Sequence, residues 1–477
     1  MPRSHTASAK SSVARQRKPA SRAAAGRKRP APVTSDAPSP ALPVKAASGL
    51  RVRMYRVGFG DFFLLSVPTA TGPSHILIDC GVHAKDLGSI RAAVTQMAKD
   101  CSNRLSLVIM THRHADHISG FGSCADIFAQ IEVARVWMPW FENPANPKAA
   151  AFQASLVAMA GDLGRQFRAR LAAGSDPQAD QLLRMAENIT GGLGGAGIAA
   201  NQKALDVLHG GFKGTQPAHD YYKAGDPPVL PPDLAAGGLS AEILGPPIDD
   251  VLIGQMTNKN EQYLAGATES GDQPERLKPF GNAFRGKRED YGDKAFAPYG
   301  FERMLRMLDA AQPDVLAAQA QAADKTLNNQ SLVILFSFGG KNLLFAGDAQ
   351  WGNWENFLYG GAYGTPGHTQ LTAKAQDILG KIDFYKVGHH GSANATPKDA
   401  VKAMRIGCVG MCSTQEHAYN EVPREPLLDA LRQRMNDQLA RSDQVAAGAD
   451  APANPLAGPL PNAFSAPEKQ LFIDYTF

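Results

Sequence analysis

The sequence predicts a globular α/β protein. Helices are predicted at residues 149–173, 178–189, 301–311 and 425–435, of which the first two are amphipathic. With 477 residues and 44% hydrophobic content, the chain can bury one large or two ordinary cores. Four short apolar runs are typical of buried strands, and each ends in a turn that carries Asp or His: residues 76–78, 105–110, 343–346 and 384–387.

Residues 1–48 are predicted to form a disordered basic tail. They contain ten Lys or Arg against the single Asp36 and show no apolar periodicity. This excess of +9 leaves −5 for the rest of a chain whose formal net charge is +4. Such a tail can contact nucleic acid, an acidic partner or a membrane surface, and a solvated tail without such a role is an equal alternative.

The run at residues 76–78 ends in Asp79, and Gly81 relieves the turn that follows it. A carboxylate in this place can orient a metal-bound imidazole, or it can belong to an ordinary turn.

Three histidines and a carboxylate, His112, His114, Asp116 and His117, follow the run at residues 105–110. Buried imidazoles need hydrogen-bond partners and repel one another when protonated, so packing explains this cluster poorly. In an extended loop His112 and His114 point to the same side, and Asp116 and His117 aim at a second point before a helix that begins near residues 118–120. Imidazole and carboxylate ligands suit zinc, and also manganese or iron.

Residues 141–325 are expected to be a largely helical insertion that caps the site. Basic and aromatic side chains at residues 278–291 can line a phosphate-binding rim, and a solvated loop is the simpler interpretation. His209 and His219 are interpreted as surface residues. The expected elements are helices at residues 149–173, 178–189 and 301–311 and a strand with its loop at residues 240–247.

Two β-rich runs at residues 333–336 and 343–346 are joined by Gly339-Gly340, a hairpin signal, and the second ends in Gly347-Asp348. The next run, at residues 384–387, ends in His389-His390. Adjacent side chains at a strand end point to opposite sides, so one histidine is expected to bind metal while the other faces substrate. We assign the metal to His389, and substrate contact or proton transfer to His390.

A strand at residues 406–411, a polar loop and the helix at residues 425–435 come next. His417, in the loop, can approach a substrate if the loop folds over the site. Residues 441–477 are expected to contain a flexible segment and, at residues 470–477, a last edge strand.

The five cysteines, Cys80, Cys101, Cys124, Cys408 and Cys412, are odd in number and lack a zinc-finger spacing. They favour buried thiols in a reducing cytoplasm over disulfides. No apolar run approaches the roughly 20 residues of a membrane span. We therefore expect a cytoplasmic protein with no transmembrane segment.

The motif from His112 to His117 after a hydrophobic strand resembles the signature of the metallo-β-lactamase fold superfamily. The resemblance covers about residues 50–430 apart from the insertion, and it implies a four-layer αβ/βα sandwich over residues 49–440. Further segments are similar, in the same order, to those of the β-lactamase-like domain of ComEC-type DNA-uptake proteins and their soluble relatives: residues 57–61, 77–81, 328–332, 344–349 and 386–392.

The resemblance implies a site for two divalent ions, for which we favour Zn²⁺ and keep Mn²⁺ as the alternative. Asp348 takes the place of the family's bridging aspartate, and Asp79 is expected to orient a ligand histidine. Many superfamily members supply a third histidine to the His112/His114 metal, and this chain offers no clear candidate. The implied ligands are His112, His114, Asp116, His117, Asp348, His389 and His390.

A hydroxide that bridges the two ions is the nucleophile that such a site implies. The ComEC-type resemblance favours a phosphodiesterase or nuclease, with nucleic acid or another phosphodiester as substrate and with Asp116, His390 and His417 as catalytic candidates. The same site on this fold can hydrolyse lactones, thioesters or amides. A non-catalytic binding module with a residual metal site is the third alternative.

Overall fold

The structure, a computed structural model, describes residues 49–83, 89–172, 197–263, 326–416, 422–443, 460–466 and 471–477, together with the single residues 174, 180, 183 and 418. Several expectations lie outside the described residues: the tail at residues 1–48, most of the helix at 178–189, the helix at 301–311, the basic and aromatic cluster at 278–291, most of the flexible segment after residue 443, and His417.

The first of two mixed sheets has eight strands. Its first part, from β13 to β3, is antiparallel, and β3, β4, β5 and β6 are parallel to one another. In spatial order the strands are β13 (Phe464–Ser465), β14 (Phe472–Thr476), β1 (Arg51–Tyr55), β2 (Phe62–Thr69), β3 (Gly72–Cys80), β4 (Arg104–Ile109), β5 (Glu132–Pro139) and β6 (Ala218–Tyr222).

The second sheet has six strands, of which β7, β8 and β9 are antiparallel and the rest parallel. The predicted hairpin is confirmed, because Gly339 and Gly340 join β8 to β9 with φ of 55° and 79°, values that suit glycine. In spatial order the strands are β12 (Leu439–Arg441), β11 (Val409–Cys412), β10 (Phe384–Lys386), β9 (Lys341–Phe345), β8 (Val333–Phe338) and β7 (Ser240–Gly245).

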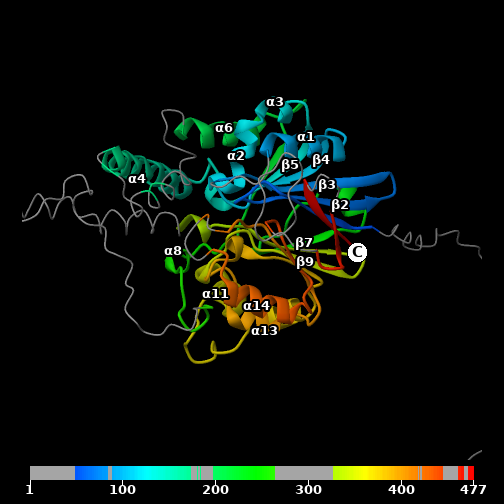
Figure 1. Cartoon of the computed structure of the whole chain (residues 1–477), viewed down its shortest axis with the longest axis vertical. Helices are drawn as coiled ribbons and strands as arrows, with labels where there is room; N and C mark the ends of the chain where they lie inside the picture. Colours follow the sequence, from blue (N-terminus) through cyan, green and yellow to red (C-terminus); the bar gives the residue numbers. More distant parts are fainter. Residues whose placement is uncertain are drawn as a thin grey trace, which may run out of the picture. The chain divides into compact units, whose positions relative to one another are not determined.

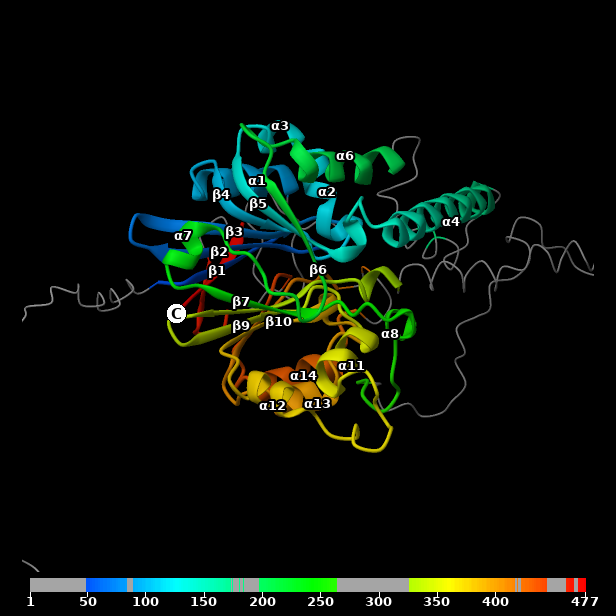
Figure 2. The same cartoon turned by 180° about the vertical axis from the view of Figure 1, so that it is seen from behind.

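The two sheets share a hydrophobic core, to which the first contributes Ile76 and Ile109 and the second Ile334 and Phe345. Alternation along β3 sends Leu77 to the opposite face, into a separate core. Helices cover that outer face, and a second group of helices covers the outer face of the second sheet (Figures 1 and 2).

The helices on the first sheet are α1 (Ile90–Asp100), α2 (Ala115–Ser123), α3 (Ala125–Phe128) and α6 (Gly197–Gly210), and those on the second are α11 (Trp351–Tyr359), α12 (Ala373–Gly380), α13 (Lys398–Ala403) and α14 (Glu425–Arg434). The short α7 (Pro232–Ala236) and α8 (Asp250–Gly254) flank β7 in the chain. The long α4 (Pro147–Ala172) follows the 3₁₀ turn η1 (Trp140–Glu142) and matches the helix predicted at residues 149–173.

Part of the expected insertion belongs to the body of the protein. β6 extends the first sheet, β7 extends the second, and Leu208 of α6 is buried in the core against α2. The strand predicted at residues 240–247 is confirmed as β7. The apolar residues of β6 were too few and too dispersed to predict a strand, and pairing with β5 supplies the missing stabilisation.

The last strand is an internal strand, contrary to the predicted edge. β14 pairs with β1 on one side and with the two-residue β13 on the other. The strand expected at residues 406–411 starts only at Val409, because Ile406 is 65% exposed and Gly407 has a φ of 74°. Among the described helices, none has both the length and the hydrophobicity that crossing a bilayer requires. The five cysteines are buried thiols.

Candidate metal centre

Asp79 lies at the end of β3 and is buried. One of its carboxylate oxygens accepts hydrogen bonds from the Thr111 hydroxyl at 2.6 Å and lies 2.7 Å from His117 Nδ1, and the other accepts from the Thr111 backbone N at 2.8 Å. This is the contact that its expected role, orienting a histidine, requires.

The predicted ligands after β4 occupy the loop and the first turn of α2. The helix begins at Ala115, earlier than expected, so that Asp116 and His117 stand on its first turn, where a carboxylate is favoured by the helix dipole. The backbone at Gly81 packs directly against the backbone of Asp116 and His117, which makes this geometry possible. A Cβ atom at Gly81 would lie 2.3 Å from the carbonyl carbon of Asp116, so that only glycine fits there.

Asp348 follows β9 and is positioned by the segment at residues 328–331. The Ser331 hydroxyl accepts a hydrogen bond from the Asp348 backbone N at 3.0 Å. Asn353 donates to the Ser331 carbonyl at 2.8 Å, and Asn329 accepts from the Asn353 backbone N at 3.3 Å. Because these side chains are buried and bonded to backbone, the loop that carries Asp348 is fixed from both sides.

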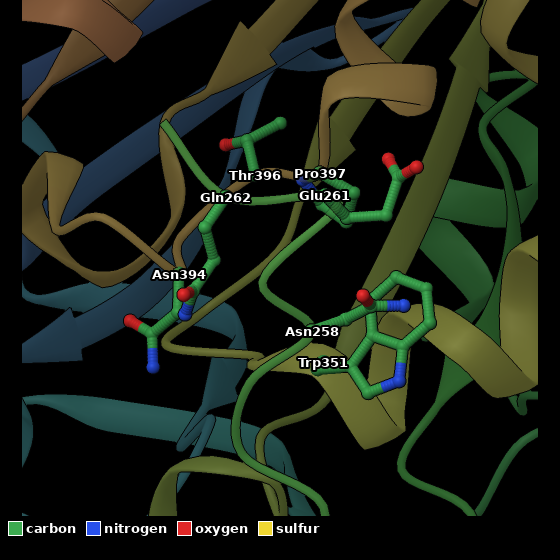
Figure 3. Close-up of a pocket in the computed structure, with 7 residues that line it drawn as sticks. All are labelled: Asn258, Glu261, Gln262, Trp351, Asn394, Thr396 and Pro397. Carbon is green, nitrogen blue, oxygen red and sulfur yellow. The ribbon is translucent and has the colours of Figure 1, made fainter. Parts of the chain in front are cut away.

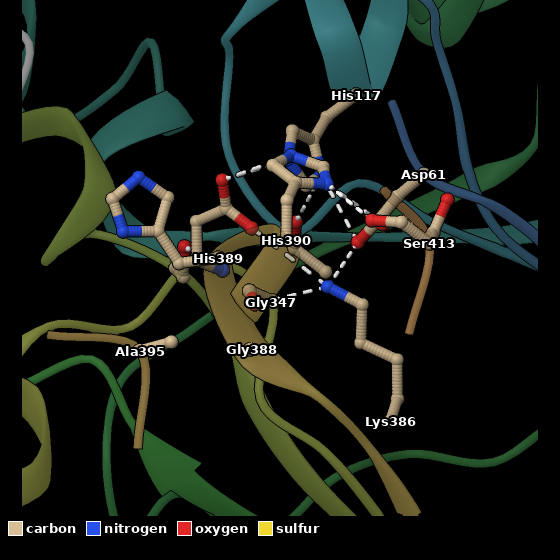
Figure 4. A network of polar contacts seen from close by, with 12 residues as sticks. Asp61, His117, Gly347, Lys386, Gly388, His389, His390, Ala395 and Ser413 are labelled. Atoms are coloured by element: carbon tan, nitrogen blue, oxygen red, sulfur yellow. Dashed lines mark hydrogen bonds and ion pairs between the residues drawn. The ribbon is translucent and has the colours of Figure 1, made fainter. Parts of the chain in front are cut away.

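His389 and His390 lie in the turn η4 (Gly388–Gly391) after β10, with φ of 42° and 51°. His390 Nε2 is 3.2 Å from an Asp116 oxygen and 3.4 Å from an Asp348 oxygen. The His389 ring instead lies 2.7 Å from the Ser392 hydroxyl and 3.3 Å from the Asn328 amide nitrogen. In Figure 4 the His389 ring points away from His117 and Asp61.

Two groups of described residues have ligand atoms within 4.8 Å of one another and could each hold a metal ion: His112, His114 and Asp116 in one, and Asp116, His117, Asp348 and His390 in the other. Asp116 is common to both groups. Every one of these side chains is at most 2% exposed. A third group, Asp61, Asp79 and His117, adjoins the second.

One sequence-based assignment differs from the geometry. His390 belongs to a candidate metal group and His389 to none among the described residues, the opposite of the predicted split. The left-handed backbone of η4 is the reason, because it turns both side chains away from the directions that a plain strand end would give. The carboxylate common to both groups is Asp116, and Asp348, the expected bridge, belongs to the second group while its charge also acts on the two histidines of the first.

The second group suits a metal ion. His117 Nδ1 faces Asp79, and His390 Nδ1 is 2.8 Å from the Ser413 carbonyl, so that both Nε2 atoms face Asp116 and Asp348. His117 Nε2 lies 3.1 Å from one Asp348 oxygen, and the other, Asp348 Oδ1, is buried and makes no hydrogen bond with the residues that the structure describes. Imidazole and carboxylate donors in this arrangement are a ligand set for zinc or manganese.

The charges show how the protein balances this group without a metal. Burial would lower the pKa of His390, but the charge of Asp348 and the hydrogen bond with Asp116 raise it to about 10. Burial likewise opposes the charges of Asp348 and Asp79 at His117, whose pKa is raised well above its usual value. The His117 and His390 rings are therefore protonated, and their positive charges offset the neighbouring carboxylates as a metal cation would.

The His112/His114 pair is different. Burial, together with the charge of His117, lowers the pKa of His112 well below its usual value and that of His114 to about 4. Both rings are therefore neutral near pH 7, and His112 Nε2 lies 3.0 Å from His114 Nδ1. Neutral imidazoles are the form that binds metal.

Asp61 and Lys386 complete the buried cluster and were missed in the sequence. The Lys386 ammonium contacts Asp61, donates to the Gly347 carbonyl at 3.1 Å and lies 3.7 Å from an Asp348 oxygen (Figure 4). Both side chains are 2% exposed. Asp61 lies in the segment at residues 57–61 and Lys386 in the segment at residues 386–392, and the motif similarity of these segments was the available signal for both residues.

The histidines outside the cluster have other surroundings. His209, on α6, and His219, on β6, are half-buried and face each other with ring centroids 5.4 Å apart. Neither is in a candidate metal group among the described residues. Among the described residues, the third member of the His112/His114 group is thus Asp116, and no third histidine belongs to this group.

A small polar hollow lies on the His389 side. Asn394, whose side-chain oxygen is 3.2 Å from His389 Nδ1, donates to the Met256 carbonyl at 3.2 Å and so attaches the segment after α8 to the η4 loop. The hollow is lined by Asn258, Glu261, Gln262, Trp351, Asn394, Thr396 and Pro397 (Figure 3). Both ring nitrogens of His389 therefore face neutral side chains, Asn394 at Nδ1 and Asn328 at Nε2.

No protein-family model matches the chain, and no curated protein matches it in sequence. Its function has to be inferred from the geometry and chemistry of the buried cluster.

Proposed function

We propose that this chain is a metal-dependent hydrolase of the metallo-β-lactamase fold, related to the ComEC-type domain, with two helix-covered sheets as its four-layer αβ/βα sandwich. The proposed ligands are His112, His114 and Asp116 for one divalent ion and Asp116, His117, Asp348 and His390 for the other. The motif order and the convergence of strand ends from both sheets at one buried cluster support this proposal.

One observation carries the proposal. Two histidines from different sheets each have Nδ1 fixed by an oxygen acceptor, Asp79 for His117 and the Ser413 carbonyl for His390, and each presents Nε2 to the same two carboxylates. Metal-binding histidines commonly donate their second ring nitrogen in this way. Asp348 Oδ1 is buried beside these rings and makes no hydrogen bond with the described residues, which is unusual for a network that serves packing alone.

We propose Zn²⁺ as the metal, with Mn²⁺ as the alternative, because nitrogen and oxygen ligands suit both. Two divalent ions, when bound, lower the pKa of a shared water, orient the scissile group and offset charge that develops on its oxygens.

The charges of the cluster match two divalent ions. Asp61, Asp79, Asp116 and Asp348 carry four negative charges, and the buried Lys386 offsets one of them. Two divalent cations would balance the remaining three charges together with the hydroxide that they share. The choice of substrate rests on the order of the sequence motifs, which resembles that of ComEC-type domains. We therefore propose phosphodiester hydrolysis, with nucleic acid as the substrate class.

The residues of the chain then have separate tasks. Asp79 and Ser413 orient the two histidines, and Lys386 holds Asp61 and the Gly347 carbonyl in place. His389 is partly exposed, unlike His390, and takes the substrate-facing place that was expected for its neighbour. The buried thiols agree with a cytoplasmic setting, which we also propose.

The test is hydrolysis by metal-reconstituted protein of single-stranded DNA, RNA, a generic phosphodiester and a lactone, beside Asp116→Ala. We expect phosphodiester cleavage that the substitution lowers by at least about a hundredfold, because Asp116 is shared by both groups. Equal activity in the variant would remove Asp116 from the reaction. Activity on the lactone alone would contradict the choice of substrate.

A further inference from the structure

Arg113 stands between two proposed ligands, His112 and His114, yet it points to a different partner. Its guanidinium donates to both carboxylate oxygens of Glu142, from Nε at 2.9 Å and from a terminal nitrogen at 2.6 Å. The two side chains are only 8% and 3% exposed. A bidentate pair of this kind fixes direction as well as distance.

The partner belongs to the segment that leads away from the sheets. Glu142 ends η1, and four residues separate it from α4. Gln153 of α4 donates to the Phe141 carbonyl and lies 3.3 Å from a Glu142 oxygen. Trp140 of the same turn stacks on Phe141 and donates from its indole nitrogen to the Pro247 carbonyl at 3.2 Å. The Arg113–Glu142 pair is therefore part of an ordered contact that joins η1 and α4 to the loop of His112 and His114.

α6 meets the loop at the same residue. The side chain of Asn201 donates to the Arg113 carbonyl at 3.3 Å. Both the backbone and the side chain of Arg113 are thus held by helices, α6 and α4 with η1, that follow β5 in the chain. Arg113 lies between His112 and His114 in the chain, so the contacts that hold Arg113 also determine the positions of the two imidazole rings.

The His112/His114 group has only three candidate ligands, one of which it shares, whereas the other group has four. An ion with fewer protein ligands depends more on how precisely they are placed. The loop that carries these histidines is the part of the site that Glu142 anchors.

We propose that Arg113 and Glu142 are positioning residues that make occupancy of the His112/His114 metal position depend on docking of η1 and α4. This rests on the proposed metal centre. The segment at residues 140–172 would then control how much metal the protein binds, in addition to any role as a cap over the site.

The experiment is a zinc titration of the full chain against a competing chelator, followed in parallel by the visible spectrum of the Co²⁺ form. For Glu142→Gln we expect one of two metal affinities to fall about ten-fold to a hundred-fold, as for other residues that orient ligands. The second affinity should stay within about two-fold of the wild type by the same measure.

Two further variants guard against a folding defect. Arg113→Met/Glu142→Leu removes both charges, leaves no buried ion unpaired, and should show the same selective loss. Gln153→Ala, on the surface-facing side of the contact, should give an intermediate loss. The matched control is Asp474→Asn, which breaks another bidentate pair, the part-buried one of Arg53 with Asp474 at 2.7 Å, in β1 and β14. It should lower stability and leave both affinities unchanged.

The outcomes separate this inference from the proposed function. Wild-type affinity for both metals in folded Glu142→Gln and in the double variant would overturn the inference and leave the metal centre standing. Parallel loss of both metals in these variants would also overturn it. A wild-type chain that binds no metal would overturn the proposed function, and this inference with it.

Discussion

His117 and His390 hold the protons that a metal has to displace. Since the pKa of His390 is raised to about 10 and that of His117 is raised well above its usual value, both rings are protonated in the metal-free protein near neutral pH. Zinc binding should therefore release protons, and its apparent affinity should rise as pH rises through neutrality. Calorimetric titration in two buffers with different ionisation enthalpies measures the number released. No dependence on the buffer would contradict these protonation states.

The same raised pKa of His390 has a consequence for the metal-free fold. It contributes stability in full below the unfolded-state pKa of about 6.5. That contribution is lost as pH rises through about 10. Bound zinc should remove this dependence, because the metal replaces the proton.

Lys386 and Asp61 form a fully buried ion pair next to Asp348. Lys386→Met leaves Asp61 buried without its cation, so it should reduce the free energy of unfolding by about 3–5 kcal/mol. Lys386→Met/Asp61→Asn removes both charges and should recover a large part of that loss. Urea denaturation of the metal-free proteins measures both. A double variant no more stable than the single one would show that the charge pair is not the cause.

The ends of β3, β4, β9 and β10 bring the cluster together, and Gly81 permits the closest approach among them. A Cβ atom there would lie 2.3 Å from the Asp116 carbonyl carbon and 2.4 Å from the His117 backbone N. Gly81→Ala should therefore displace the first turn of α2, cost more than about 3 kcal/mol and weaken metal binding. The control is Gly380→Ala, where the new methyl group meets nothing within 4 Å. Equal stability of the two variants in thermal unfolding would contradict this account.

The strands and their polar ends could be predicted because the apolar runs are short, continuous and followed by glycine, Asp or His. β4, the β8/β9 hairpin and α14 are all where the sequence suggested. The choice between His389 and His390 could not be predicted, since it depends on left-handed backbone that residues other than glycine rarely adopt. The pairing of Lys386 could not be recognised either, because its partner Asp61 is brought close only by the packing of one sheet on the other.

The whole molecule places the cluster where two sheets meet. The first sheet supplies the His112–His117 loop and Asp79, and the second supplies Asp348, Lys386 and His390. Because the group of Asp116, His117, Asp348 and His390 takes its residues from both sheets, a metal bound there should stabilise the two sheets against each other. Zinc should therefore raise the thermal unfolding temperature in proportion to the logarithm of its free concentration.

The measurement that decides whether this cluster is a metal centre is the metal content of the purified full chain after zinc loading and removal of loosely bound ions. We expect two zinc ions per chain by elemental analysis, and about one or fewer for Asp116→Asn, since this carboxylate is common to both groups. A wild-type chain without bound zinc or manganese, or an Asp116→Asn chain with full content, would contradict the assignment.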